Sequence, residues 1–135
     1  MLGKTRRAEL RALLEDYLAR LRHYAEVEAV ELRDSTAALR KLVLSPAAVV
    51  VLLDVAGKHV TSEQFARWLG EQRRGTREIV FLCGDAEGFP EELRRKAASR
   101  LALSTLTFSH ELARVMLAEQ LYRAFTILSG HPYAK

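Results

Sequence analysis

The stretch S-T-L-T-F-S-H-E-L-A-R-V-M-L-A-E-Q-L-Y-R-A-F-T-I-L-S-G-H-P-Y, residues 104–133, decides how this chain folds. It predicts a loop, one long helix and a short tail. Ser109 is a suitable N-cap, and Glu111 places a negative charge in the first turn. Gly130 stands where a left-handed residue would end the helix, and Pro132 prevents the helix from resuming.

The apolar residues of this helix cover well over half of its circumference. A stripe of that width predicts burial on more than one side, against the sheet of the same chain and against a second surface. Glu119 and Arg123 are four residues apart and can form an ion pair. The apolar residues are Leu112, Val115, Met116, Leu117, Leu121, Tyr122, Ala124, Phe125 and Leu128.

The composition of the 135-residue chain predicts a single folded domain, residues 1–135, with 49% hydrophobic residues for its core. No apolar run reaches the roughly 18 residues that a membrane span needs, and no signal-like segment opens the chain, so we expect a cytoplasmic protein. The net charge of +4 permits a polyanionic partner but does not identify one. The single cysteine, Cys83, excludes an internal disulfide and is read as a small apolar residue rather than a nucleophile.

Upstream of the long helix, apolar and β-branched runs predict four strands. Residues 47–54 and 78–83 are continuously apolar, which is typical of strands buried on both faces of a parallel sheet. Residues 27–32 and 101–104 are shorter candidates. Helices are expected at residues 5–24, capped by Thr5, and from Ser35 or Thr36 to about 44. Two more are expected from a capping box at residues 61–64 and from Pro90 at the first helical position.

This alternation of helices and strands predicts an α/β fold, with a parallel sheet covered by helices on both faces. Ligands of such sheets sit beyond the carboxyl ends of the strands. The loops expected there are residues 54–58, 84–88 and 104–109, all rich in Gly, Ser, Thr or Asp. Such loops suit a close approach of backbone to ligand.

The pattern L-T-x-x-H-x-L-x-R-x-x-L-x-E-Q-x-Y-R-A-x-x-I-x-x-x-H-P-Y, residues 106–133, resembles the C-terminal signature of the RlmH family. Members of that family are SPOUT-superfamily methyltransferases that act on N3 of a pseudouridine in large-subunit (23S) ribosomal RNA. The segment L-D-x-x-G-K, residues 53–58, and Gly84 with Glu87-Gly88 resemble two further family loops. The resemblance covers roughly residues 48–133.

The resemblance implies an SPOUT-type domain in which these loops join a trefoil knot, a known exception to the rule against threading. It implies a homodimer formed through the C-terminal helix, with ribosomal RNA or the 70S ribosome as partner and with no membrane and no metal. It also implies S-adenosylmethionine as cofactor, held mostly by backbone groups. The residues implied to line it are Leu53, Gly84, Gly88, Ser104, Thr105, Leu106, Thr107 and Phe108.

Methyl transfer needs the nucleophile in line with the methyl carbon and deprotonated at the right moment. His131 is the candidate base, Arg114 and Arg123 are candidates to steady negative charge or phosphate, and Tyr133 can stack on a base. His110 is a candidate substrate contact. Each has a plainer interpretation: His131 could close a turn, and His110 could be a first-turn residue bonded to water.

The chain also departs from the family pattern. Its end reads Tyr133-Ala134-Lys135, without the family's terminal histidine, and Asp85 and Ala86 replace a Gly and a Pro of the second loop. The chain opens at Met1 where the family has already run a strand, so an exposed sheet edge or an uncovered apolar groove is expected. The alternative function is therefore a non-catalytic dimeric RNA-binding or ribosome-associated module, and a weaker one is a small-molecule-binding α/β domain.

Overall fold

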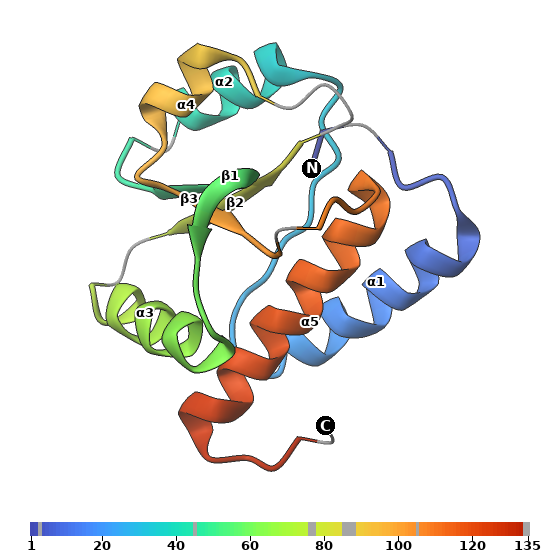
Figure 1. Cartoon of the computed structure of the whole chain (residues 1–135), viewed down its shortest axis with the longest axis vertical. Helices are drawn as coiled ribbons and strands as arrows, with labels where there is room; N and C mark the ends of the chain where they lie inside the picture. The colour runs from blue at the N-terminus through green and yellow to red at the C-terminus, as the bar shows by residue number, and fades with distance from the viewer. Residues whose placement is uncertain (3, 45, 76–77, 85–88, 105, 134–135) are drawn as a thin grey trace.

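The structure is a computed structural model that describes residues 1–2, 4–44, 46–75, 78–84, 89–104 and 106–133. Figure 1 shows a central sheet with α2 and α4 on one face and α1, α3 and α5 on the other. The elements are α1 (Ala8–Leu21), α2 (Ser35–Val43), β1 (Val49–His59), α3 (Ser62–Arg74), β2 (Ile79–Cys83), α4 (Glu91–Lys96), β3 (Ser99–Ala102) and α5 (His110–Ser129). No helix among the described residues is long and apolar enough to cross a membrane.

The sheet has three strands in the order β2-β1-β3, and both pairings are parallel. Leu53 of β1 pairs with Cys83 of β2 and with Leu101 of β3. The predicted parallel α/β fold is therefore confirmed. The trefoil knot stays a prediction.

Two apolar cores lie on the two faces of this sheet. Leu14, Phe65 and Phe125 belong to the core between the sheet and α1, α3 and α5. Leu42 and Leu93 belong to the core under α2 and α4. The first four residues of β1 are buried, as expected of a strand covered on both faces. Cys83 lies in this interior, where burial raises the pKa of its thiol, in agreement with its interpretation as a small apolar residue.

The long helix α5 begins and ends as predicted. The hydroxyl oxygen of Ser109 accepts a hydrogen bond from the Leu112 amide at 3.2 Å, and Gly130 has a φ of 71°. The ion pair between Glu119 and Arg123 forms at 2.8 Å. Helix α5 contacts α1, α3 and β2, so its wide apolar surface is buried against two helices as well as the sheet. On α5, Leu112 near the start and Ile127 and Leu128 near the end stay 37–44% exposed.

Several predicted boundaries are wrong. Helix α1 begins at Ala8 rather than at residue 5, and Thr5 is not its cap, because the Thr5 hydroxyl binds Arg114. The predicted loop at residues 55–58 belongs to β1, because Lys58 and His59 pair with β3. Strand β3 spans Ser99–Ala102, two residues earlier than the predicted strand at residues 101–104. Asp34, not Ser35 or Thr36, caps α2, and Pro90 is the N-cap of α4 rather than its first residue.

The predicted strand at residues 27–32 is also wrong. Its one ladder contact is an isolated parallel bridge between Leu32 and Leu2. The Leu2 amide donates to the Cys83 carbonyl oxygen at 2.9 Å, and the Leu32 amide donates to that of Met1 at 2.7 Å. Met1 and Leu2 thus lie between residues 30–32 and the end of β2. A strand forms where a neighbour runs along it, and here the neighbour is two residues long.

Candidate active site

Because the strands are parallel, their carboxyl ends lie at the same end of the sheet, which we call its carboxyl edge. Since Leu53 pairs with both Cys83 and Leu101, the residues that follow, Asp54 and Gly84, lie at the same edge. One carboxylate oxygen of Asp54 accepts from the Ala56 amide at 3.0 Å. Its other oxygen is buried without a hydrogen-bond partner among the described residues, and the guanidinium of Arg100 is 3.7 Å away, beyond hydrogen-bonding distance. This edge therefore holds an unused acceptor.

Gly57 allows β1 to bulge at this edge. The pairing of β1 with β3 shifts register between Leu53 and Lys58, so the intervening residues are extra in β1. A Cβ on Gly57 would lie 2.7 Å from the carbonyl carbon of Arg100 and 2.8 Å from the amide nitrogen of Leu101. Those atoms belong to the backbone, which cannot move away as a flexible side chain could, so the bulge requires glycine here.

The loop between β3 and α5 leaves its backbone accessible. The Ser104 hydroxyl accepts a hydrogen bond from the Leu106 amide at 3.0 Å. Leu106 is 69% exposed, Thr107 is exposed and Phe108 is half-buried. His110 follows as the first residue of α5. Thr105 and Gly88, also predicted to line the cofactor, lie outside the described residues, as do Asp85, Ala86 and Ala134.

Arg114, predicted to steady negative charge, has a different position. Its side chain is buried, with 1% of its surface exposed. It donates to the Thr5 hydroxyl at 2.8 Å and to the Leu2 carbonyl oxygen. Two of its nitrogens are therefore used in fastening the N-terminal segment to α5. Within this chain the geometry gives Arg114 a structural role.

Tyr133 is packed at the opposite end of α5. The guanidinium carbon of Arg123 lies 4.7 Å from its ring centroid, and the Tyr122 ring meets it edge-on at 4.8 Å. The hydroxyl oxygens of Tyr133 and Tyr17 are 3.4 Å apart. Burial, followed by this hydrogen bond, raises the pKa of Tyr133 above its ordinary value. The phenol is therefore neutral at physiological pH.

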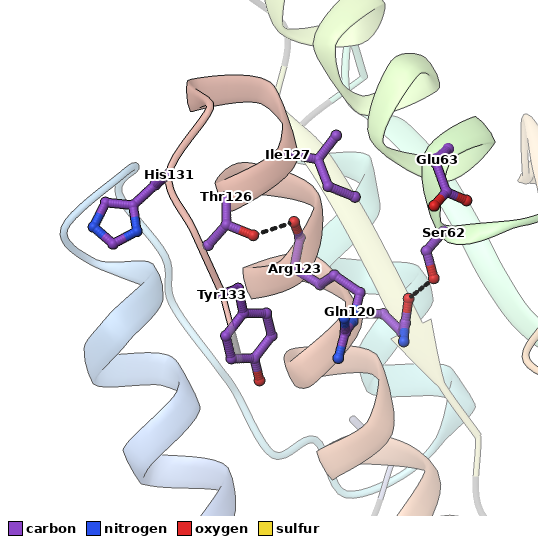
Figure 2. Close-up of a pocket in the computed structure, with 8 residues that line it drawn as sticks. All are labelled: Ser62, Glu63, Gln120, Arg123, Thr126, Ile127, His131 and Tyr133. Carbon is purple, nitrogen blue, oxygen red and sulfur yellow. Dashed lines mark hydrogen bonds between the residues drawn. The ribbon is translucent and has the colours of Figure 1, made fainter. Parts of the chain in front are cut away.

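A pocket of about 390 Å³ adjoins Tyr133 where α3 begins (Figure 2). On its α3 side, the Ser62 hydroxyl donates to the side-chain oxygen of Gln120 at 2.8 Å. The guanidinium of Arg123 is fixed from the other side by Glu119, at 3.0 and 2.8 Å. The lining is Ser62, Glu63, Gln120, Arg123, Thr126, Ile127, His131 and Tyr133. The pocket is therefore lined mostly by polar side chains, and the guanidinium of Arg123 among them is held in place by Glu119.

His131 closes the turn after α5 and leaves its ring exposed, and its role as a base stays a prediction. Its backbone amide donates to the Thr126 carbonyl oxygen at 3.0 Å, which closes the turn after the helix. Its ring is exposed, and Nδ1 lies 2.9 Å from the Pro132 carbonyl oxygen. That contact favours the tautomer with the proton on Nδ1, which leaves Nε2 as an acceptor.

The two halves of the predicted site are separated within one chain. His110 and the loop before it lie at the start of α5, whereas His131 and Tyr133 follow its end (Figure 1). With a rise of about 1.5 Å per residue, the 20 residues of α5 hold these ends about 30 Å apart. One chain therefore does not bring the predicted catalytic tail to the predicted cofactor loops. No cluster of His, Cys, Asp and Glu suited to a metal occurs in the described part of the chain.

Sequence reasoning missed Tyr17, which contacts the tail at Tyr133, and Arg20, which packs on the rings of Tyr17 and Tyr122. The guanidinium carbon of Arg20 lies 5.6 Å from the ring centroid of Tyr17 and 5.7 Å from that of Tyr122. Tyr17 lies within the helix predicted at residues 5–24, for which no role in the site was predicted. The available signal was its hydroxyl, which needs a polar partner when the ring is buried.

The chain matches a family model described as "Predicted SPOUT methyltransferase" over residues 1–134. Proteins named ribosomal RNA large subunit methyltransferase H are similar to it over nearly their whole length. The one from Koribacter versatilis is 43% identical over 136 residues, covering 98% of this chain and 92% of its own. The one from Gemmatimonas aurantiaca is 39% identical over 148 residues, covering 100% and 96%. The chain belongs to the SPOUT methyltransferase family, in the group that contains these large-subunit methyltransferases.

Proposed function

We propose that this protein transfers a methyl group from S-adenosylmethionine to N3 of a pseudouridine in 23S ribosomal RNA. Membership of the SPOUT methyltransferase family makes it an enzyme of methyl transfer. One observation carries the proposal: in a chain of this family, Leu53 pairs with Cys83, so Leu53 and the Gly84 that follows Cys83 lie side by side at the carboxyl ends of β2 and its neighbours. The substrate follows from the name that its relatives share. A ribosomal substrate would place the reaction in the cytoplasm.

The residues at the edge fit the proposed cofactor. Leu53, Leu106 and Phe108 offer apolar surface to an adenine ring, and the backbone of Gly84 and Thr107 is accessible for hydrogen bonding. The Asp54 oxygen that is ion-paired with Arg100 at 3.7 Å has no hydrogen-bond donor among the described residues and can accept from a hydroxyl or amino group. S-adenosylmethionine supplies the activated methyl group when bound.

The tail would act on the target base. His131 is the proposed general base for the N3 proton, since its exposed ring has Nε2 free to accept it. Arg123 would stabilise the negative charge that develops on the base, from a position fixed by Glu119 and Tyr133. Tyr133 would position the base as a neutral phenol. His110 and Arg114 remain proposals as RNA contacts, and the burial of Arg114 argues against direct contact.

A second copy of the chain would complete the site. The cofactor loops and the tail are about 30 Å apart along α5, so an antiparallel pairing of two such helices would bring the tail of one copy to the loops of the other. The partly exposed side chains of Leu112 near the start of α5 and of Ile127 and Leu128 near its end supply apolar surface for that contact. We therefore propose a homodimer with shared sites.

Calorimetric titration with S-adenosylmethionine tests the enzyme proposal, followed by mass spectrometry of 23S RNA from 70S ribosomes incubated with both. We expect binding and one added methyl group on a pseudouridine. Absence of binding at millimolar cofactor would leave RNA binding without turnover as the function. Methylation of a different nucleotide would correct the substrate alone.

Mixing two inactive variants tests the shared site. Consider a mixed dimer of one His131→Ala chain and one Gly84→Val chain. If each site is built across the interface, one site combines the intact tail of the Gly84→Val chain with the intact loops of the His131→Ala chain. Activity should then reappear on mixing. If each chain formed its own site, both sites of every mixed dimer would be defective and no activity would return. Light scattering shows independently whether the chain is dimeric.

A further inference from the structure

Three basic side chains lie close together in the segment ahead of α1. Lys4, Arg6 and Arg7 are exposed, whereas Thr5 between them is fully buried. Within the part of the chain that the structure describes, no carboxylate forms an ion pair with any of these three side chains. We call residues 4–7 the basic segment. Its cationic groups are therefore available to a partner.

Thr5 fixes the middle of the basic segment to the rest of the fold. Its hydroxyl accepts a hydrogen bond from the buried guanidinium of Arg114 at 2.8 Å. Its amide donates to the carboxylate of Glu31 at 3.2 Å, and its carbonyl oxygen accepts from Nε of Arg11 at 3.0 Å. Because the Thr5 side chain is bound in the interior, the basic side chains on either side of it remain in solvent.

A carboxylate in the first turn of α5 holds the second half of the basic segment. Oε1 of Glu111 accepts from the Arg7 amide at 3.0 Å and also from the Arg6 amide. The bond from the Arg7 amide is the largest cause of a lowered pKa of Glu111, so this carboxylate is charged at neutral pH. Glu111 binds the backbone of these two residues, and it therefore fixes their position while their guanidinium groups stay free.

The basic segment lies beside two of the predicted cofactor loops. Through Glu111 it contacts the start of α5, where His110 follows the loop after β3. At its other end, the Leu2 amide donates to the carbonyl oxygen of Cys83 at 2.9 Å, one residue before Gly84. Figure 1 shows this part of the chain, in blue, passing the start of α5. Three cationic groups are therefore held at the carboxyl edge of the sheet.

Phosphate is the ligand that suits these groups. Arginine donates paired hydrogen bonds to phosphate oxygens, and lysine binds phosphate as a compact charge. Contacts to phosphate hold a nucleic acid in position without reading its sequence. An RNA strand whose base receives a methyl group at the carboxyl edge must pass close to the basic segment. The position of the segment therefore favours RNA over an acidic protein as its partner.

We propose that Lys4, Arg6 and Arg7 bind phosphates of the ribosomal RNA strand next to the target pseudouridine. In the proposed dimer, this basic segment belongs to the chain whose loops hold the cofactor, and the tail belongs to its partner. The two chains then hold the RNA from different sides of the target base. The identity of the RNA rests on the proposed function, whereas the phosphate contacts themselves do not depend on turnover.

The salt dependence of RNA binding tests this proposal. The variant is Arg6→Gln with Arg7→Gln, and the probe is a 23S RNA transcript titrated at about 50 to about 200 mM salt. Each lost phosphate contact reduces the slope of log K against log salt by about 0.7–0.9 in magnitude. We expect the slope to fall by about 1.5–2 and binding to weaken about tenfold at about 100 mM salt.

Two further variants separate charge from other effects. Arg67→Gln with Arg74→Gln removes the same charge from exposed positions of α3 and should leave the slope nearly unchanged. Arg6→Lys with Arg7→Lys keeps both charges and should retain most of the slope. The amide bonds to Glu111 involve only backbone donors, so melting temperatures should match that of the unsubstituted chain.

An unchanged slope in the Arg6→Gln, Arg7→Gln variant, or an equal fall in the α3 control, would overturn the proposal. Competition separates the two kinds of partner: polyuridylate should displace the transcript, and stronger displacement by polyglutamate would overturn the choice of RNA. Calorimetry with S-adenosylmethionine should give equal affinities for all variants. If the unsubstituted chain transfers no methyl group but shows the expected slopes, the proposed function fails and the phosphate contacts stand.

Discussion

The hydroxyl oxygen of Tyr133 lies 3.4 Å from that of Tyr17, a residue 116 positions earlier in the chain. This contact joins the tail after α5 to the middle of α1. Together with the guanidinium of Arg123 on its ring and the edge of Tyr122, it gives Tyr133 three neighbours from two helices. The position of the proposed catalytic tail therefore depends on how α1 packs against α5.

Stability should fall at alkaline pH through Tyr133. Burial and the hydrogen bond with Tyr17 raise the pKa of Tyr133 in the folded protein, so folding favours the neutral phenol. The resulting stabilisation is fully present below the unfolded pKa of about 10 and is lost as pH rises through the folded pKa. Urea unfolding at pH 8 to 11 should show a smaller decline for Tyr133→Phe than for the unsubstituted chain. Tyr24→Phe is the control and should keep the full decline; identical declines in all three would contradict this role.

His131→Ala should reduce methyl transfer about a hundredfold or more, the usual contribution of a general base. Its affinity for S-adenosylmethionine should be unchanged, because the proposed cofactor contacts come from the loops after the strands and not from His131. Single-turnover rates against pH measure the effect. His23→Ala, which removes another exposed imidazole, is the matched control. Normal turnover with an unchanged pH profile in His131→Ala would mean that solvent or RNA accepts the proton.

Arg114→Met should destabilise the fold by about 2–3 kcal/mol, because it removes charged hydrogen bonds and leaves the Leu2 oxygen and the Thr5 hydroxyl without their donor. Arg67→Met, a change at an exposed arginine of α3, should stay within about 0.5 kcal/mol. Denaturant unfolding measures both. Loss of turnover at full stability would restore the catalytic role first predicted for Arg114.

Gly57→Ala should be strongly destabilising, because its Cβ would lie 2.7–2.8 Å from backbone atoms of Arg100 and Leu101. We expect a loss of about 1–3 kcal/mol, as for other overpacked positions, together with weaker cofactor binding. Gly70→Ala is the control: its Cβ would meet only the end of the flexible Leu128 side chain, at 3.0 Å. Thermal melting compares the two. Equal melting temperatures would show that β1 and β3 can separate at low cost.

Local patterns predicted much of the fold correctly. The caps of α5 at Ser109 and Gly130, the capping box at Thr61 and the continuous apolar strand after Pro46 each depend on residues close in sequence. The same holds for the family resemblance, whose motifs are contiguous. Apart from the strand predicted at residues 27–32, the elements, their order and the parallel sheet followed from these patterns.

The positions of the site residues were decided by the tertiary structure. Arg114 reaches Leu2, 112 residues away, and Tyr133 reaches Tyr17, and no local period encodes either pairing. Strand β1 extends past Asp54 only because β3 is there to pair with it.

The sequence by itself determined the elements, their order and the family, because helix periodicity, capping and strand hydrophobicity act between residues that are near in the chain. The structure alone decided that Arg114 is buried and that Tyr17 contacts the tail at Tyr133. Burial and pairing depend on which distant segments become neighbours, and that is a property of the assembled fold.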